Sequence, residues 1–190
     1  MKTQYNKMLQ RIKAYVYIYI ILSFIINYAY SNSVITIIAN YSVKGKQTMI
    51  ALDKKSGNSI SIKNIDTNQN IGYTYFYERH ICGEYELIYF DVVPGRYEIK
   101  ITTSLKSLSL RCLTMGDSCH FDSVVIKNSG EINITDLSLA FSRCYNLKSV
   151  DLSDLDMTGV TGFYRMFEDC QNLISVNFGN LLLKRNVFEM

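Results

Sequence analysis

Five residues carry the side chains that most often bind zinc or act as nucleophiles. They are both histidines of the chain and three of its cysteines: His80, Cys82, Cys112, Cys119 and His120. Thiolate and imidazole groups are the usual zinc ligands, and a cysteine beside a histidine can be activated as a nucleophile. The paired C-x-x-C spacing of a structural zinc site is absent, and Cys119 and His120 are adjacent, which makes joint ligation of one tetrahedral ion awkward. Glycine-rich phosphate loops are absent too, so the sequence predicts no metal, no cofactor and no enzymatic activity.

Two other groups of side chains could bind a ligand. Asp151, Ser153, Asp154 and Asp156 carry oxygen atoms of the kind that Ca²⁺ prefers. The tyrosines of residues 72–91 could form an exposed platform for carbohydrate or protein. A short acidic loop is also what a surface turn requires, and alternating tyrosines also fill a β-sheet core. The structural interpretation is favoured for both.

The five cysteines of the chain point to disulfide chemistry in an exported protein. Cys112 and Cys119 are close enough in sequence to close a small loop, which leaves Cys82 as the natural odd cysteine. Sequence spacing does not fix the connectivity. A Cys112–Cys119 disulfide is therefore a prediction to be tested against the fold.

The N-terminal segment, residues 1–32, has the composition of an export signal. Four basic residues precede an uncharged run, residues 14–30, which ends in small and polar residues. This order predicts a cleaved signal peptide, and the run is also at the short limit for a membrane anchor. In either case the basic residues mark the cytoplasmic side, and the rest of the chain is predicted to be secreted or displayed on the cell surface.

The net charge excludes one class of partner. Of 20 Lys and Arg residues, four lie in residues 1–32 and none of the 17 acidic residues does, so 16 basic residues face 17 acidic ones in the remainder. Nucleic-acid binding depends on clustered basic side chains that contact phosphates. A nearly neutral chain argues against such a partner.

The middle of the chain, residues 33–126, has the pattern of a β-rich domain. Short runs of alternating β-branched and aromatic residues are separated by polar turns, as in residues 97–102. Pro94-Gly95 predicts a type II turn that joins a hairpin. The stretch YFDVVPGRYEIKIT resembles the last strands of PKD-like immunoglobulin-type domains, which implies a small β-sandwich.

The C-terminal region, residues 127–190, contains an internal repeat. Residues 137–162 align without a gap with residues 163–188. Seven positions are identical between them: Phe141/Phe167, Cys144/Cys170, Asn146/Asn172, Leu147/Leu173, Ser149/Ser175, Val150/Val176 and Leu155/Leu181. A fixed period of this length predicts a solenoid of stacked coils, here two coils and a partial third.

Each coil is predicted to contain a two-turn helix followed by a short strand. Apolar residues first recur at i, i+3, i+4 and i+7 and then follow the L-x-x-L-x-L line of leucine-rich repeats. The predicted core of the repeats is Phe141, Cys144, Leu147, Val150, Leu152, Phe163, Met166, Phe167, Cys170, Leu173, Val176 and Phe178. Stacking places Cys144 above Cys170, within reach of a disulfide, but burial on the apolar face favours two free thiols.

The repeat resembles that of the BspA-like leucine-rich-repeat surface proteins, whose pattern reads M-F-x-x-C-x-x-L-x-x-L-D-L-S. The residues AFSRCYNLKSVDLSDLDMTGVTGFYRMFEDCQNLISVNF, 140–178, carry this likeness, and nearly all departures keep the apolar or polar character of the position. The resemblance implies a secreted or surface-displayed protein whose repeats mediate adhesion or protein binding.

The predicted fold class is therefore mainly β with short helices: a small sandwich-like domain followed by a leucine-rich-repeat-like solenoid. A second hypothesis is a truncated or structural surface component that self-associates through its open end, at Leu181, Leu182 and Leu183. For the favoured binding function, a protein or cell-surface ligand would be recognised by residues that differ between the coils. Examples are Arg143/Asp169 and Lys148/Ile174.

Overall fold

The computed structural model describes residues 33–51, 59–80, 83–103, 107–109, 113, 119–130 and 132–179. Several predictions fall outside these residues: the export signal at 1–32 with its run at 14–30, the cysteines Cys82 and Cys112, and the predicted self-association residues Leu181 to Leu183. Most side chains of the predicted tyrosine platform, residues 72–91, are also outside the description.

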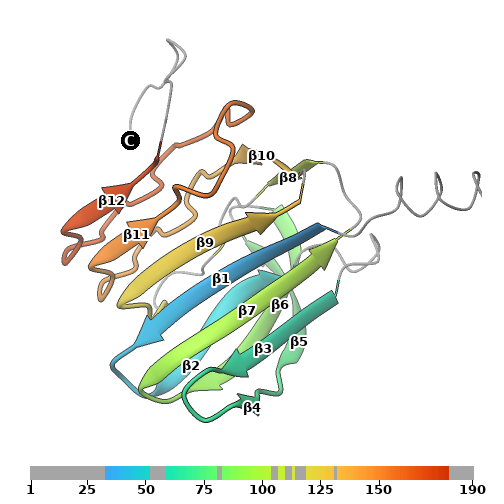
Figure 1. Ribbon diagram of the computed structural model, residues 1–190, viewed down its shortest axis with the longest axis vertical. Helices are drawn as coiled ribbons and strands as arrows, with labels where there is room; N and C mark the ends of the chain where they lie inside the picture. The colour runs from blue at the N-terminus through green and yellow to red at the C-terminus, as the bar shows by residue number, and fades with distance from the viewer. Residues whose placement is uncertain are drawn as a thin grey trace, which may run out of the picture. The chain divides into compact units, whose positions relative to one another are not determined.

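The described residues form a mainly β structure, which confirms the coarse fold prediction (Figure 1). The largest sheet has seven strands in the order β12-β11-β9-β1-β7-β3-β4. Their bounds are β1 Ser33–Tyr41, β3 Ser59–Asn64, β4 Gln69–Asn70, β7 Gly95–Thr103, β9 Ser123–Ser129, β11 Ser149–Asp151 and β12 Ser175–Asn177. A three-stranded sheet contains β2 Gly45–Ala51, β6 Gly83–Val92 and β5 Thr74–His80, and a short pair contains β10 Asn133–Asp136 and β8 Ser107–Ser109.

The sheet changes from antiparallel to parallel at β9. β1 pairs antiparallel with β7 on one side and with β9 on the other. β9 then pairs in parallel with β11, and β11 in parallel with β12. The predicted domain boundary after residue 126 lies inside β9, so one sheet contains strands from both predicted regions.

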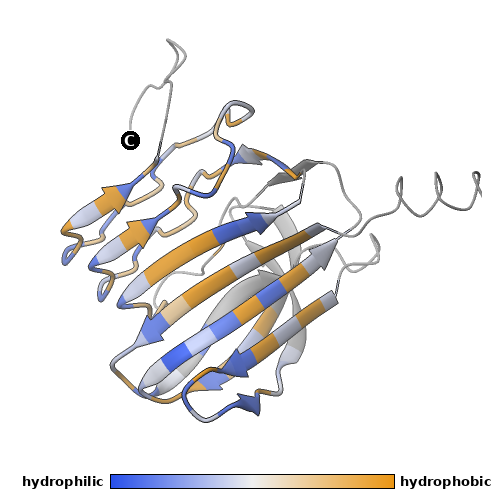
Figure 2. Cartoon of the chain, viewed as in Figure 1, coloured by the Kyte–Doolittle hydropathy of each residue, from blue (hydrophilic) through white to orange (hydrophobic). Residues whose placement is uncertain are grey.

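Alternation of side chains explains how this sheet builds the core. In β1 the residues Ile35, Ile37 and Ala39 are fully buried, while Thr36 and the other intervening residues are only half-buried. β7 has the same alternation of burial, and in Figure 2 orange segments alternate with blue ones along the middle of this strand. Period-two patterning therefore directs one face of the sheet to the core, as the sequence predicts.

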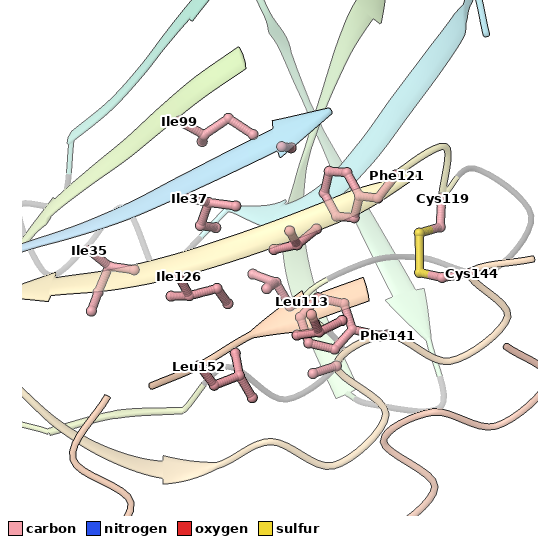
Figure 3. Packing of buried hydrophobic residues seen from close by; sticks show 14 of the residues in the cluster. Ile35, Ile37, Ile99, Leu113, Cys119, Phe121, Ile126, Phe141, Cys144 and Leu152 are labelled. Atoms are coloured by element: carbon pink, nitrogen blue, oxygen red, sulfur yellow. A yellow bond between two sulfur atoms is a disulfide. The ribbon is translucent and has the colours of Figure 1, made fainter. Parts of the chain in front are cut away.

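The core is continuous between the β-rich region and the repeats. Phe90 on β6 and Ile37 on β1 belong to the same buried cluster as Phe141 and Leu152 of the repeat region. Figure 3 draws Ile35, Ile37 and Ile126 as members of this cluster, together with Phe141 and Leu152. Burying apolar surface is the dominant favourable term in folding, so the repeats and the β-rich region stabilise each other.

The turn at Pro94-Gly95 corrects a prediction. It does not close a hairpin, because β6 and β7 belong to different sheets and do not pair. Gly95 has φ 147°, and a Cβ there would lie 3.1 Å from Asp66 Oδ2. Asp66 accepts hydrogen bonds from the backbone N–H and Nε of Arg96, both at 2.8 Å, and these bonds lower the pKa of its carboxyl group. The turn thus moves the chain from one sheet to the other.

The predicted short helices are wrong, since the described residues contain no helix. Residues 138–143 and 164–169 form successive turns in their place. Leu139 and Arg143 have φ values of 57° and 58°, and Arg165 and Asp169 have 50° and 58°. A left-handed residue inside a single helical turn breaks the run of right-handed dihedrals that an α-helix requires. The apolar spacing correctly indicates one buried face, but turns build that face.

Two buried tyrosines provide a first test of the core. Tyr41 and Tyr97 pack edge to face with ring centroids 5.0 Å apart. The Tyr97 hydroxyl accepts a hydrogen bond from Val93 N at 3.0 Å, whereas Tyr41 Oη has no hydrogen-bond partner among the described residues. Burial, with the nearby Tyr97 as a second cause, raises the pKa of Tyr41 well above its usual value.

We expect Tyr41→Phe to raise the free energy of unfolding by about 1 kcal/mol, because it removes a buried hydroxyl that has lost its hydration. Tyr97→Phe is the matched control and should lower the free energy of unfolding by about 1 kcal/mol, since it leaves Val93 N without its acceptor. Urea unfolding curves of the two variants measure both effects. Equal losses of stability in both variants would contradict the assignment of the unpaired hydroxyl to Tyr41.

Candidate interaction surface of the repeats

The strand register follows the period of the sequence repeat. Ser123 pairs with Ser149 and Ser149 with Ser175, and the next position joins Val124, Val150 and Val176 in the same way. The parallel pairing of β11 and β12 is what the period of the two repeats predicts. The pairing with β9 shows that the register begins one repeat earlier than the sequence comparison indicates.

Residues outside the strands follow the same register. Backbone N–H groups of four residues donate to carbonyl groups that lie one coil further along the chain: Leu137 to Gly162, Leu139 to Tyr164, Phe141 to Met166 and Arg143 to Glu168. The four N···O distances lie between 2.7 and 3.0 Å. These bonds take the place of helical hydrogen bonds, because every second residue of the turn segment bonds to the next repeat. Backbone N–H and C=O groups that no helix pairs within the repeat are thereby hydrogen-bonded.

The predicted core residues separate into two groups by burial. In the first repeat Phe141, Cys144 and Leu147 are fully inaccessible to solvent. The other buried members are Val150, Leu152, Phe163 and Met166. The predicted core residues of the second repeat that follow Met166 are only half-buried: Phe167, Cys170, Leu173, Val176 and Phe178.

The disulfide prediction is wrong. Cys119 is bonded to Cys144, with Cα atoms 5.0 Å apart, and so cannot be bonded to Cys112 (Figure 3). The same bond overturns the expected free thiol at Cys144. The physical reason is the ladder: Lys148 N donates to Asp122 O at 2.8 Å, so the segment after Cys119 lies beside the segment after Cys144. Proximity along the chain, the basis of the Cys112 prediction, does not report this proximity in space.

Cys170 is a free thiol, as predicted, and is half-buried. Its Sγ donates a hydrogen bond to the Phe141 carbonyl oxygen at 3.0 Å, which places it against the preceding repeat. Burial is the main cause that raises the pKa of the Cys170 thiol to about 11. The thiol is therefore protonated at neutral pH and is a poor nucleophile.

The exposed positions of the two repeats carry different side chains on the same backbone. Arg143 and its equivalent Asp169 are both exposed and both have φ 58°. Lys148 is exposed, and its equivalent Ile174 is 83% exposed, the highest value for a large apolar residue among the described part of the chain. We call these residues, together with the exposed Tyr145 and Tyr164, the variable surface.

Side-chain contacts order part of the variable surface. The guanidinium of Arg165 lies 5.0 Å from the centre of the Tyr164 ring and pairs with Glu168 Oε1 at 2.9 Å. Asn172 Nδ2 donates to the Tyr145 carbonyl at 2.6 Å, across the two repeats. Lys148 Nζ pairs with Asp122 Oδ1 at 3.2 Å. A cation over an aromatic ring and a fixed amide reduce the side-chain entropy that binding must overcome.

Carboxyl groups of the acidic loop that follows β11 accept hydrogen bonds from residues of the loop itself. Asp151 Oδ1 accepts from Ser153 N, and Asp156 Oδ1 accepts from both Thr158 N and Thr158 Oγ1. The Ser153 and Thr158 hydrogen bonds are the main causes that lower the pKa values of these two carboxyl groups. Asn177, the equivalent of Asp151, makes the same bond to Gly179 N. Among the described residues no three His, Cys, Asp or Glu side chains gather as metal ligands would.

His120, one of the candidate ligands, lies near Gln47. Its backbone N–H donates to the buried Gln47 Oε1 at 3.0 Å, and its ring lies so close to Gly45 that a Cβ on that residue would meet Nε2 at 2.7 Å. The ring therefore packs against backbone, and its neighbour Cys119 is held in the disulfide. The side chain of His80 and all of Cys82 are outside the described residues.

The sequence comparison did not identify residues 119–136 as an earlier member of the stacked repeats. The signal was present: within residues 119–179 the dipeptide Ser-Val occurs at 123–124, 149–150 and 175–176, at the spacing of the repeat. Thr135 and Thr161 are also identical, and Thr161 N donates to the Thr135 carbonyl at 2.9 Å. The Phe and Cys positions that define the later repeats do not recur in this segment, so the likeness was too sparse to recognise.

Comparison with protein-family models, curated proteins and solved structures found no match to the chain. The described residues include no helix of the length and apolarity that crossing a bilayer requires.

Proposed function

We propose that the chain is an exported surface protein of the BspA-like kind, whose repeats form a short solenoid that mediates adhesion or protein binding. One observation carries the proposal: the two repeats keep positive φ values at the same two positions and apolar residues at the core positions, while the exposed residues change. Arg143 and Asp169 have the same φ value and opposite charges. A constant frame with varied exposed side chains is what a recognition surface of stacked repeats requires.

The composition of the variable surface supports a protein or cell-surface ligand. It combines an apolar residue, Ile174, with the aromatic rings of Tyr145 and Tyr164 and with charges of both signs. Tyrosine and arginine are enriched where proteins contact one another, and exposed apolar side chains gain most from being covered. The near balance of charge outside residues 1–32 favours such a ligand over a polyanion.

The experiment uses cells that express the full chain or its variants. We expect protease added to intact cells to cleave the chain, and we expect these cells to adhere to a host-cell or neighbouring-cell surface that non-expressing cells do not bind. Ile174→Asp should reduce adhesion several-fold, while the free energy of unfolding changes by less than about 0.5 kcal/mol, because Ile174 is on the surface.

Val93→Asp is the matched control. Val93 is also an exposed apolar residue, at 45%, but it lies between β6 and β7, outside the repeats. Adhesion of this variant should equal that of the unmodified chain. Protection of the chain from external protease until lysis would contradict surface display, and undiminished adhesion of Ile174→Asp would contradict the role of the variable surface.

A further inference from the structure

β12 is the last strand at one edge of the seven-stranded sheet. Its inner edge pairs with β11, and its outer edge pairs with no strand of the described residues. A strand edge of this kind presents unpaired N–H and C=O groups and is a template for pairing with another chain.

Hydrogen bonds on the inner edge show which groups face outward. Ser175 N donates to Lys148 O at 3.2 Å, and Asn177 O accepts from Leu152 N at 2.8 Å. Ser175 and Asn177 therefore direct their backbone groups toward β11. Because successive residues of a strand point in opposite directions, the N–H and C=O of Val176 face the outer edge.

The apolar residues beside this edge are less buried than their equivalents one repeat earlier. Phe141 and Leu147 are 0% exposed, whereas Phe167 and Leu173 are only half-buried. The first repeat is covered because the second repeat stacks on it, with the rings of Phe141 and Phe167 parallel and 5.7 Å apart. The second repeat keeps apolar surface whose natural complement is another repeat of the same kind.

The opposite end of the array is closed. β9, the first strand of the repeating register, pairs on its other side with β1 from Val34 to Asn40. A second copy therefore cannot stack on the repeats at β9. Two copies that pair through their repeats meet through the same end, at β12, which generates a closed two-fold arrangement.

We propose that two copies of this chain associate through their β12 edges, antiparallel, about a two-fold axis at Val176. In this register the N–H and C=O of Val176 exchange hydrogen bonds with those of Val176 in the second copy, and Ser175 lies opposite Asn177. Both of these side chains are small and polar, so the pairing introduces no like-charge contact. The contact closes on itself, so it produces a dimer and no longer polymer. It goes beyond the adhesive function and does not rest on it.

The test is sedimentation of the full chain in mild detergent over a range of concentrations. The unmodified chain should show a monomer–dimer equilibrium with no larger species. Val176→Pro removes the outward N–H, and proline is tolerated on an edge strand in that orientation. We expect this variant to dissociate at concentrations at least ten-fold higher than the unmodified chain, whereas Val176→Thr, which keeps the N–H, should dimerise as the unmodified chain does.

Hydrogen exchange measured by NMR on the unmodified chain provides a second readout that needs no folded variant. The Val176 amide should become protected as the concentration rises, while the Val150 amide, on the inner strand, stays protected throughout. A monomer at all concentrations, open-ended polymer, a Val176→Pro dimer as stable as the unmodified one, or a Val176 amide whose exchange is independent of concentration would each overturn the proposal.

Discussion

Replacing Phe141 with alanine is expected to lower the free energy of unfolding by about 4 kcal/mol. The Phe141 ring is fully inaccessible to solvent and belongs to the cluster that joins the repeats to β1 and β9. Loss of the ring removes apolar burial and leaves a cavity that a rigid sheet cannot close. Urea unfolding, followed by circular dichroism of the β structure, measures the change.

Phe167→Ala is the matched control, because Phe167 occupies the equivalent position one repeat later. Its ring stacks on that of Phe141 but is only half-buried. The expected loss is about 2 kcal/mol, roughly half that of Phe141→Ala. Equal losses at the two positions would show that the second repeat is as fully covered as the first, against the gradient of burial described above.

Breaking the Cys119–Cys144 disulfide is expected to cost about 3 kcal/mol of stability, because the bond restricts the entropy of the unfolded chain. The bond closes a loop across a sequence separation of 25 residues, and the size of this loop sets the magnitude. Cys144→Ala should therefore unfold at a markedly lower urea concentration than the unmodified chain. The bond joins the segment before β9 to the first repeat. We therefore expect the whole sheet of Cys144→Ala to unfold in a single transition.

Cys170→Ala separates the disulfide from the loss of a buried sulfur. Cys170 occupies the equivalent position in the second repeat, is free and is half-buried, so its replacement should cost about 1 kcal/mol or less. A reducing agent should abolish most of the difference between the unmodified chain and Cys144→Ala, and leave the effect of Cys170→Ala unchanged. Insensitivity of the unmodified chain to reduction would contradict the stabilising role of the bond.

Local patterns were sufficient to predict the β structure. Alternation in residues 97–102 identified β7, and the period of the repeat identified the pairing of Ser149 with Ser175. Both features depend on side-chain periodicity, which the backbone geometry of a strand imposes on the sequence. The candidate variable residues, such as Lys148 and Ile174, were identified for the same reason: a repeat shows directly which positions are free to change.

Predictions of local conformation were wrong where contacts between segments remote in the sequence decide the structure. The spacing of Leu137, Ala140, Phe141 and Cys144 suits one face of a helix, yet hydrogen bonds to the next repeat, such as Phe141 N to Met166 O, stabilise a series of turns. Pro94-Gly95 has the composition of a hairpin turn, but its flanking strands find better partners in two sheets. Local propensity is a weak preference that tertiary hydrogen bonds and burial override.

The sequence by itself determined the period of the repeat, the apolar identity of its buried positions and the mainly β character of the chain, because each of these is encoded in residues near one another. Only the tertiary structure decided that β9 begins the array, that Cys119 bonds to Cys144, and that the second repeat leaves its apolar side half-covered. These facts depend on which segments lie side by side in space. The number of residues between two segments does not set that distance, since a folded chain brings remote segments together whenever doing so buries apolar surface and pairs backbone groups.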